Sequence, residues 1–376
     1  MLKRIIVILL SFLLVSWLSG CSSGNTETRT SLTTPVSSSQ QSSTGIIEQS
    51  DTTQPDTNDT TSQVPGEKLS EQSSTVAVTD IDQDGVSDEI EDQLTSKFAP
   101  IIKFHTEEQY LLANIPWYLD RVRMRYDVSF GFDAQLLDRG NINITNLVSQ
   151  EYKGRSSGLS AEHTEFFLEQ TDTSGGDELD SYRLSTRKGS GKAEWVCYAH
   201  VRLASTSHNP EMYDIQYIFF YAYNGDLLMS VAESAHEADF EHITVRVKND
   251  LSTIDKIFYA AHDIEGRWYD YGSSPEVDNG YELSDDGRPI VYSALNSHAS
   301  YPWADIWDRG NLPDDVTNED GIEWDTLAKI TNIGEKRYPL PGNSWIQYSG
   351  RWGEIGETGF TTGPFGPAYQ GWWNAD

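Results

Sequence analysis

The sequence predicts a mainly β fold for residues 98–376, which form a single large domain. Gly, Pro and aromatic residues interleave through the C-terminal half of the chain, as in proteins built from strands and turns. The run YDIQYIFFYAYNGD, from Tyr213, is aromatic and β-branched and ends in a turn, which is typical of a buried strand. By length alone, one large domain or two small ones are allowed, and the sequence contains no internal repeat.

The charge of the chain limits what it binds. The formal net charge is −31, and most of the acidic residues follow residue 75. Such a surface repels phosphate backbones, so we expect no nucleic-acid partner. It suits a protein that binds cations or that stays soluble in salt.

The first residues indicate export. Lys3 and Arg4 precede an apolar run, Ile5 to Trp17, which is too short to span a bilayer. The following LSGC resembles a bacterial lipobox, which implies a signal peptide at 1–20, cleavage before Cys21 and lipid on that cysteine. We therefore expect a lipid-anchored protein of the cell envelope, facing outside the cytoplasm, with the membrane as a partner. The alternative is a plain secretory signal with a chance cysteine.

Residues 21–75 form a tether. They are rich in Ser and Thr and lack Phe, Trp and Tyr, so they cannot bury enough surface to fold, and disorder is expected. A coil of this length spans on the order of 40 Å.

Cys197 is the one thiol that lipidation leaves. No intramolecular disulfide is then possible, and the core must stabilise the fold. The stretch EWVCYAHV reads as a strand, which favours a buried, inert cysteine over a catalytic thiolate.

The stretch DIDQDGVSDEIE matches the twelve-residue EF-hand calcium loop position by position. Gly85 falls at position 6, where the loop turns sharply. Carboxylates or a backbone carbonyl stand at every ligand position, and these residues are Asp80, Asp82, Asp84, Val86 (carbonyl), Asp88 and Glu91. The sequence therefore predicts bound calcium.

The calcium loop belongs to a short segment, 76–97. No helical pattern precedes the loop, but SDEIEDQLTSKF predicts a helix after it. In this respect it resembles calcium loops of exported bacterial modules and thrombospondin-type repeats, which implies an affinity near 10⁻⁴ to 10⁻³ M. The expected role is to clamp the tether onto the domain. The alternative is an acidic helix N-terminus, which the helix dipole favours without any metal.

A second polar cluster lies in ESAHEADFEHITVRV, residues 233–247. Strand alternation puts Asp239 and Glu241 on the face of Ile243, Val245 and Val247, and His236 can curl over the same spot. Two carboxylates at the rim of an apolar face must be paired, protonated or bound to a cation. The residues alone leave a metal site and a buried polar network equally open.

Several blocks of residues 97–376 resemble the vacuolar protein sorting-associated protein 62 family. They include KFAPIIKFHTEEQY, IFFYAYNG, AHEADFEHITVRV, SALNSHASYP and GPFGPAYQGWW. This resemblance implies no substrate.

The six-residue pattern His-x-x-Asp-aromatic-Glu is also similar to a motif of the necrosis-inducing cytolysin family. That resemblance implies a β-sandwich, hence a β-sandwich-like fold here, with a divalent cation near an acidic cleft that recognises sugar headgroups of membrane lipids. His236, Asp239 and Glu241 match its functional positions, Asp226 is the nearest match to an upstream acid, and a second histidine of the family motif is missing.

Two further features lie near this cleft. His298 follows a predicted strand and can face the same pocket, or it can cap a turn. Trp303 and Trp307 in WADIWD can stack on a sugar, or they can simply cover the end of the sheet.

Three functions follow as expectations. The first is a module that binds a glycan or lipid headgroup with a divalent cation of unknown identity. The second is a metal-dependent hydrolase of extracellular glycans or esters, with Glu241 or Asp239 as general base. The third is a structural envelope protein.

Overall fold

The structure is a computed structural model that describes residues 79–127, 133–149, 166–171, 185–204, 212–225, 235–262, 266–270, 280–310, 312–356 and 359–374. Ala77–Asp376 forms one compact unit. The predicted signal peptide, Cys21 and the predicted tether lie outside the described residues, as does Asp226.

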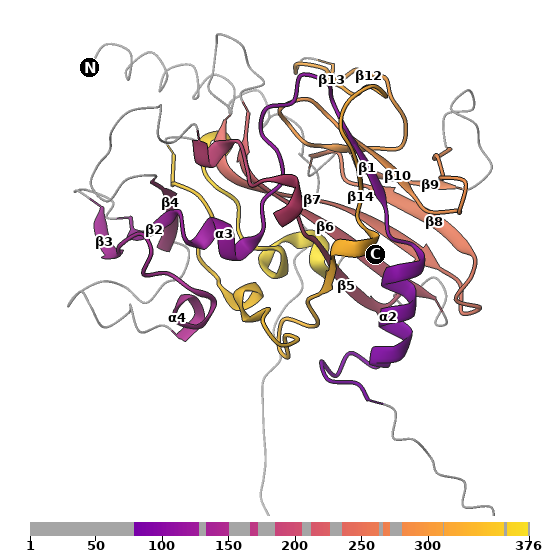
Figure 1. The fold of residues 1–376 in the computed structure, drawn as a ribbon, viewed down its shortest axis with the longest axis horizontal. Helices are drawn as coiled ribbons and strands as arrows, with labels where there is room; N and C mark the ends of the chain where they lie inside the picture. The colour runs from indigo at the N-terminus through magenta and orange to yellow at the C-terminus, as the bar shows by residue number, and fades with distance from the viewer. Residues whose placement is uncertain are drawn as a thin grey trace, which may run out of the picture. The chain divides into compact units, whose positions relative to one another are not determined.

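Strands outnumber helices among the described elements (Figure 1). The α-helices are α2 (Asp88–Lys97), α3 (Ile115–Leu119) and α4 (Ile144–Ser149). The longer strands are β1 (Ile101–Phe104), β2 (Val122–Tyr126), β3 (Ala134–Leu137), β4 (Phe166–Gln170), β5 (Cys197–Leu203), β6 (Tyr213–Asn224), β7 (His236–Val247), β8 (Ile254–Tyr259), β9 (Arg267–Asp270) and β10 (Ile290–Ser293). The short strands are β11 (Ser300–Tyr301), β12 (Ile306–Trp307), β13 (Asp315–Val316), β14 (Glu323–Asp325) and β15 (Ile330–Asn332). Short 3-10 helices complete the C-terminal part, at Lys192–Glu194, Leu327–Lys329, Ser344–Gln347, Gly359–Thr361, Pro367–Tyr369 and Gly371–Asn374.

A six-stranded sheet in the order β15-β5-β6-β7-β8-β9 forms the centre of the fold. The twelve-residue strands β6 and β7 run antiparallel through its middle (Figure 1). A four-stranded sheet, β11-β10-β1-β14, a three-stranded sheet, β3-β2-β4, and the pair β12-β13 accompany it.

The two faces of the central sheet pack into different cores. One face meets the four-stranded sheet in a cluster that contains Ile102, Tyr217, Ile243 and Val291. The other face meets the three-stranded sheet, α3 and the C-terminal segment in a second cluster that includes Trp345. The first pair of layers is a β-sandwich, so the predicted mainly β, sandwich-like fold is confirmed.

The predicted alternation in β7 is also confirmed. Ile243, Val245 and Val247 belong to the sandwich core, whereas Phe240 belongs to the second cluster. Alternation fails before Asp239, because Ala238 has a φ of +58°. As a result Glu237 also faces the second core, where its carboxylate accepts a hydrogen bond from the Gln170 backbone N–H at 2.9 Å.

The predicted helix after the acidic loop is present as α2. Its N-cap Ser87 accepts a hydrogen bond from the Ile90 N–H, and acidic residues fill its first turn, as the helix dipole favours. Leu94 and Phe98 extend the sandwich core, and the Tyr217 hydroxyl donates to the Thr95 carbonyl at 2.9 Å. The loop and α2 are therefore part of the domain surface. None of the described helices is long and apolar enough to cross a membrane.

Candidate functional site

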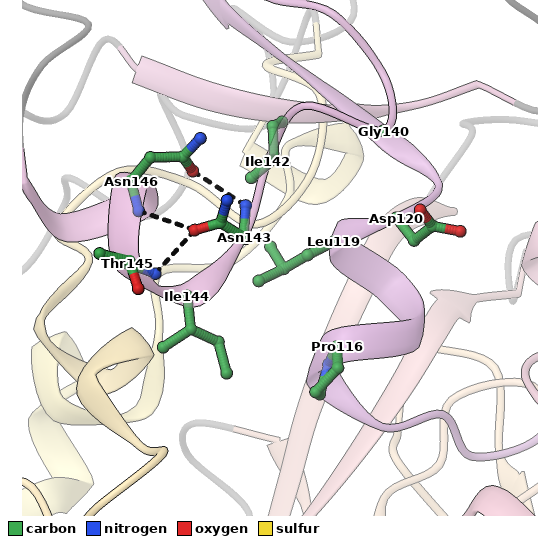
Figure 2. Close-up of a pocket in the computed structure, with 9 residues that line it drawn as sticks. All are labelled: Pro116, Leu119, Asp120, Gly140, Ile142, Asn143, Ile144, Thr145 and Asn146. Atoms are coloured by element: carbon green, nitrogen blue, oxygen red, sulfur yellow. Dashed lines mark hydrogen bonds between the residues drawn. The ribbon is translucent and has the colours of Figure 1, made fainter.

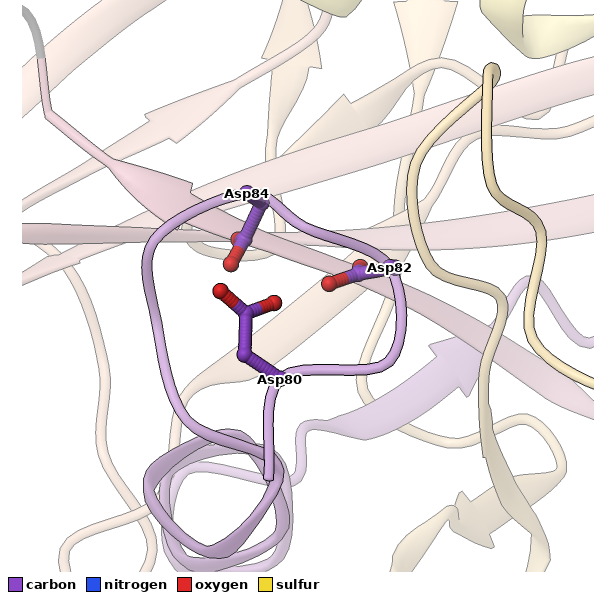
Figure 3. Close-up of side chains that lie close together, drawn as sticks. All are labelled: Asp80, Asp82 and Asp84. Atoms are coloured by element: carbon purple, nitrogen blue, oxygen red, sulfur yellow. The ribbon is translucent and has the colours of Figure 1, made fainter. Parts of the chain in front are cut away.

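The loop before α2 has the geometry of a cation cradle. Gly85, at φ +92°, makes the sharp turn, and its N–H donates to Asp80 Oδ2 at 3.2 Å. The Val86 N–H donates to Asp84 Oδ1 at 2.6 Å. Asp80, Asp82 and Asp84 point into the loop (Figure 3), and one carboxylate oxygen from each lies within 4.8 Å of the others.

Six carboxylate oxygens of this loop are buried and have no hydrogen-bond partner. Asp82 and Glu91 are both 0% exposed, and neither oxygen of either side chain makes a hydrogen bond. Asp80 Oδ1 and Asp84 Oδ2 are buried without partners as well. A buried, unpaired carboxylate is costly, so this arrangement is stable only with protons or a cation at its centre.

The pKa values of the loop carboxylates also favour a bound cation. Burial, reinforced by the neighbouring acids, raises the pKa of Asp82 to about 6, that of Asp84 to about 7 and that of Glu91 to about 8. These carboxyl groups retain protons near pH 7, and a cation that binds them displaces those protons. Carboxylate oxygens are hard ligands, which calcium and magnesium prefer, so these residues fit the predicted calcium ion.

Val86 and Asp88 occupy the two other predicted ligand positions of the loop. Val86 is buried in the sandwich core, so the packing of its side chain holds this part of the loop in place. Asp88 Oδ1 accepts a hydrogen bond from the Ile81 N–H at 3.0 Å, which closes the loop onto the first turn of α2. Its other oxygen can contribute through water, as position 9 of such loops often does.

Residues far along the chain complete the surroundings of the loop. A Cβ on Gly334 would lie 3.1 Å from the Asp82 Cβ, so the chain after β15 passes directly over the loop. Asn332, on β15, is close enough to Glu91 to favour its charged form, without a hydrogen bond of standard geometry. The negative charge of Glu335 adds to the repulsion at Asp82 and Asp84. No pattern in the sequence indicated a role for these three residues.

The second predicted cluster lies at one end of the sandwich. Asp239 Oδ2 lies 3.1 Å from His298 Nδ1 and accepts from Asn224 Nδ2 at 3.2 Å. On its other side, His298 Nε2 is 3.7 Å from Glu108 Oε1. The structure thus brings His298 to Asp239, as the sequence suggested, and adds Glu108 and Asn224, which the sequence analysis missed.

His298 has the environment of a permanent cation. It is 0% exposed and stacks on Tyr221, with ring centroids 3.8 Å apart. Burial by itself lowers the pKa of His298, but Glu108 and Asp239 more than compensate and raise it to about 9. In return, the pKa of Glu108 lies below its usual value, although burial opposes this. The buried carboxylates here are therefore paired, unlike those of the loop.

His236 and Glu241 do not join this pair directly. His236 Nδ1 lies 2.8 Å from the Ala238 carbonyl, and Glu241 is half-buried opposite Phe219. Across the ranges that the structure describes, Asp80, Asp82 and Asp84 form the one group of three or more His, Cys, Asp or Glu with ligand atoms within 4.8 Å. His236, Asp239 and Glu241 form no such group, and the cation expected there stays a prediction.

A histidine that the sequence analysis did not single out lies close by. His262 Nε2 is 2.7 Å from Asp315 Oδ2, and Asp315 also accepts from the hydroxyls of Tyr301 and Ser297 at 2.7 Å each. Asp315 is buried, whereas His262 is 22% exposed. The signal that could have found it is AAHD at the end of a predicted strand.

Trp303 and Trp307 pack against the protein. Trp307 stacks on Tyr301 with ring centroids 4.3 Å apart and contacts Trp303 at 4.9 Å. Trp303 is only 8% exposed. This packing corresponds to the alternative in which the two indoles cover the end of the sheet.

Cys197 is fully buried in the sandwich core, and burial raises the pKa of its thiol far above the usual range. Such a thiol is inert, as its predicted place in a strand indicated.

A surface hollow of about 850 Å³ lies between α3 and α4 (Figure 2). The asparagines that line it are hydrogen-bonded within the chain, because Asn143 Oδ1 accepts from the backbone N–H groups of Thr145 and Asn146. Asp120 is its one ionisable lining residue. We see no chemistry in this hollow.

Residues 157–355, more than half of the chain, match the family model described as vacuolar protein sorting-associated protein 62. No curated protein matches the chain significantly. Among solved structures, necrosis and ethylene inducing protein 2, from the causal agent of cocoa's witches' broom disease, is 13% identical with a TM-score of 0.33, over 68% of this chain and 79% of that one. NLPPya, solved in complex with mannosamine, is 10% identical with a TM-score of 0.33, over 76% of this chain and 91% of that one.

Proposed function

The chain belongs to the vacuolar protein sorting-associated protein 62 family, and from that premise we propose that it is a calcium-binding, membrane-tethered module of the cell envelope whose β-sandwich binds a glycan or lipid headgroup. The observation that carries the calcium part is the set of buried carboxylate oxygens without partners on Asp82 and Glu91.

Calcium suits this loop better than magnesium does. Calcium accepts six to eight oxygen ligands in a flexible arrangement, including a bidentate carboxylate. The loop offers three aspartates that converge on one point, and Glu91 at the position that is bidentate in such loops. Magnesium demands near-ideal octahedral geometry and keeps several waters, which two fully buried carboxylates do not favour.

The bound ion would act as a clamp. Glu91 and Leu94 share α2, so an ion on Glu91 is linked to a helix whose Leu94 lies in the sandwich core. The loop also lies under Gly334, at the end of the six-stranded sheet. Calcium would therefore hold the point where the tether enters the domain against both elements.

Limited proteolysis tests the clamp. With calcium, cleavage within residues 76–98 should be slow, and a chelator should speed it while the sandwich stays resistant. Asp82→Asn should behave like the chelated protein, and Asp92→Asn, an exposed acid on the same helix, like the wild type. Equal cleavage with and without calcium would rule out a clamp.

The anchoring part rests on the LSGC motif before Cys21. Several acyl chains on that cysteine would bind a membrane stably. Cys21→Ala should release the protein from the membrane fraction, measured by fractionation of the expressing cells. Retention of the variant in membranes would contradict lipidation at this residue.

The ligand part rests on the acidic side chains that gather at the sheet end. Burial raises the pKa of the Tyr221 hydroxyl, and the charges of Glu108, Glu241 and Asp239 add to this effect, so the three carboxylates lie near one ring. A second divalent cation, of unknown identity, would bind here through His236, Asp239, Glu241 and Asp226 and would in turn bind hydroxyl-rich headgroups. His298, which carries a proton between Glu108 and Asp239, would hold Asp239 in position instead of binding the ion.

One observation favours hydrolysis as a second candidate function. The carboxylate of Asp315 orients His262, whose Nδ1 has no hydrogen-bond partner in the described part of the chain. An oriented, partly exposed imidazole is suited to move a proton. A screen of glycosides and esters with His262→Gln as the matched variant distinguishes the two functions, because pure binding predicts no turnover by either protein.

A further inference from the structure

A smaller hollow of about 410 Å³ lies on the C-terminal segment, away from the sheet-end residues described above. Among its lining residues are Lys336, Arg337, Gln347, Tyr369 and Asn374. Its size falls within the range of small-molecule sites. Of its lining residues, only Glu335 also acts on the calcium loop, so the basic side chains of the hollow need their own explanation.

Two cations without counter-ions line this hollow. Lys336 Nζ lies 3.3 Å from the centroid of the Tyr369 ring, and the Arg337 guanidinium lies 5.2 Å from that of Tyr338. Neither makes an ion pair or a side-chain hydrogen bond within the described ranges. In a chain with 58 acidic and 27 basic residues, two adjacent basic side chains left unpaired in one hollow are unexpected.

The one acidic residue that lines the hollow is already engaged. Glu335 Oε1 lies 3.0 Å from His200 Nε2, and the pKa of Glu335 is lowered by this contact. The His200 ring in turn stacks on Trp373, with centroids 3.8 Å apart. The carboxylate is thus held toward the sheet, and the free charge in the hollow is positive.

The remaining lining groups suit a sugar. Gln347 and Asn374 are exposed residues. The Gln347 Nε2 donates to the Lys336 carbonyl at 3.0 Å, which orients this amide and leaves its oxygen as an acceptor, while the Asn374 amide offers both donors and acceptors to hydroxyl groups. Tyr369 is 36% exposed, and its hydroxyl is fixed by donating to the Gln347 carbonyl at 2.9 Å. One face of this ring lies under Lys336 Nζ, so the fixed ring holds that ammonium in place beside Gln347 and Asn374.

We propose that this hollow binds a carboxylate-bearing sugar of the uronic acid class. The Arg337 fork receives the carboxylate, Lys336 adds a second positive charge, and the amides of Gln347 and Asn374 bind the ring hydroxyls. Arg presents two parallel N–H groups that match a carboxylate. This site is independent of the proposed calcium and headgroup functions.

Calorimetric titration of the purified protein with D-glucuronate tests the proposal, with D-glucose and sodium sulfate titrated in parallel. Glucuronate should bind, glucose should bind at least about tenfold more weakly, and Arg337→Gln and Lys336→Gln should each weaken glucuronate binding by about tenfold. Lys256→Gln is the matched control, because Lys256 Nζ also lies over an aromatic ring, that of Trp268 at 4.6 Å, outside the hollow. It should bind as the wild type does.

Three outcomes would overturn the proposal. Glucuronate binding that both pocket variants retain would place the sugar elsewhere. Sulfate binding as tightly as glucuronate would show a simple anion site without sugar recognition. If the folded wild-type protein binds no glucuronate and glucuronate does not change its melting temperature, the site is excluded, because the intact hollow then has no affinity for the sugar.

Discussion

The calcium loop and the sheet-end cluster both bury carboxylates, but they solve the problem of buried charge differently. In the loop, Asp82 and Glu91 have no partners and their pKa values rise. At the sheet end, Asp239 and Glu108 flank His298, and the pKa of Glu108 falls although burial opposes this. A buried carboxylate that the protein leaves unpartnered points to an external cation, whereas one that lies beside a built-in cation is stable without it.

The largest expected effect comes from removing the built-in cation. His298→Ala would leave Asp239 and Glu108 buried without it, which should lower the free energy of unfolding by about 3–5 kcal/mol. His236→Ala, which removes a half-buried imidazole outside the pair, should cost about 1 kcal/mol. Chemical denaturation measures both. Equal, small effects would show that the sheet-end pair is not what stabilises this region.

The response to pH separates the two regions. Acids with raised pKa values stabilise the calcium-free protein at low pH, and this contribution is lost as pH rises through about 6 to 8. The contribution of His298 is complete below its unfolded pKa of about 6.5 and is lost as pH rises through about 9.

Below pH 6.5, therefore, the loop acids are the only ones of these groups whose titration should change the free energy of unfolding. The melting temperature in chelator should fall between pH 5 and 6.5, and this fall should be smaller in Glu91→Gln, where only Asp82 and Asp84 still contribute. Saturating calcium should remove the fall, because calcium binds the ionised carboxylates. A fall of the same size in Glu91→Gln would assign the effect to other groups.

A smaller effect is expected from the residue that supports the loop from β15. Asn332 favours the charged form of Glu91, and loss of such a supporting group typically weakens metal binding about tenfold or more. Asn332→Ala should therefore weaken calcium binding in a calorimetric titration while one ion still binds. Asn343→Ala is the control for local packing, because Asn343 donates to the Asn332 carbonyl at 3.1 Å and contributes nothing to Glu91. Unchanged affinity in Asn332→Ala would confine the site to the loop.

The same contrast explains what could be predicted from the sequence. The loop is contiguous, so fixed spacing from Asp80 to Glu91 was enough to predict converging carboxylates. Strand periodicity likewise placed Asp239 on the sandwich face. The partners of Asp239 are His298, 59 residues further along the chain, and Asn224 on β6, 15 residues before it, and spacing along the chain carries no information about such contacts.

Backbone conformation was a second feature that could not be predicted from the sequence. Ala238, at φ +58°, reverses the alternation expected for β7, and alanine gives no warning of a left-handed conformation. His262 and His298 also have positive φ values, of 55° and 58°. Both lie beside the buried polar network, so the positions where local rules fail are those of the candidate site.

Calcium stoichiometry tests the central claim most directly. Equilibrium dialysis against calcium should give one ion per chain at the loop, lost in Glu91→Gln and retained in Asp92→Asn, because Glu91 is buried without a hydrogen bond and Asp92 is exposed on the same helix. Wild-type protein that binds no calcium, or Glu91→Gln that binds it as tightly as the wild type, would contradict the account.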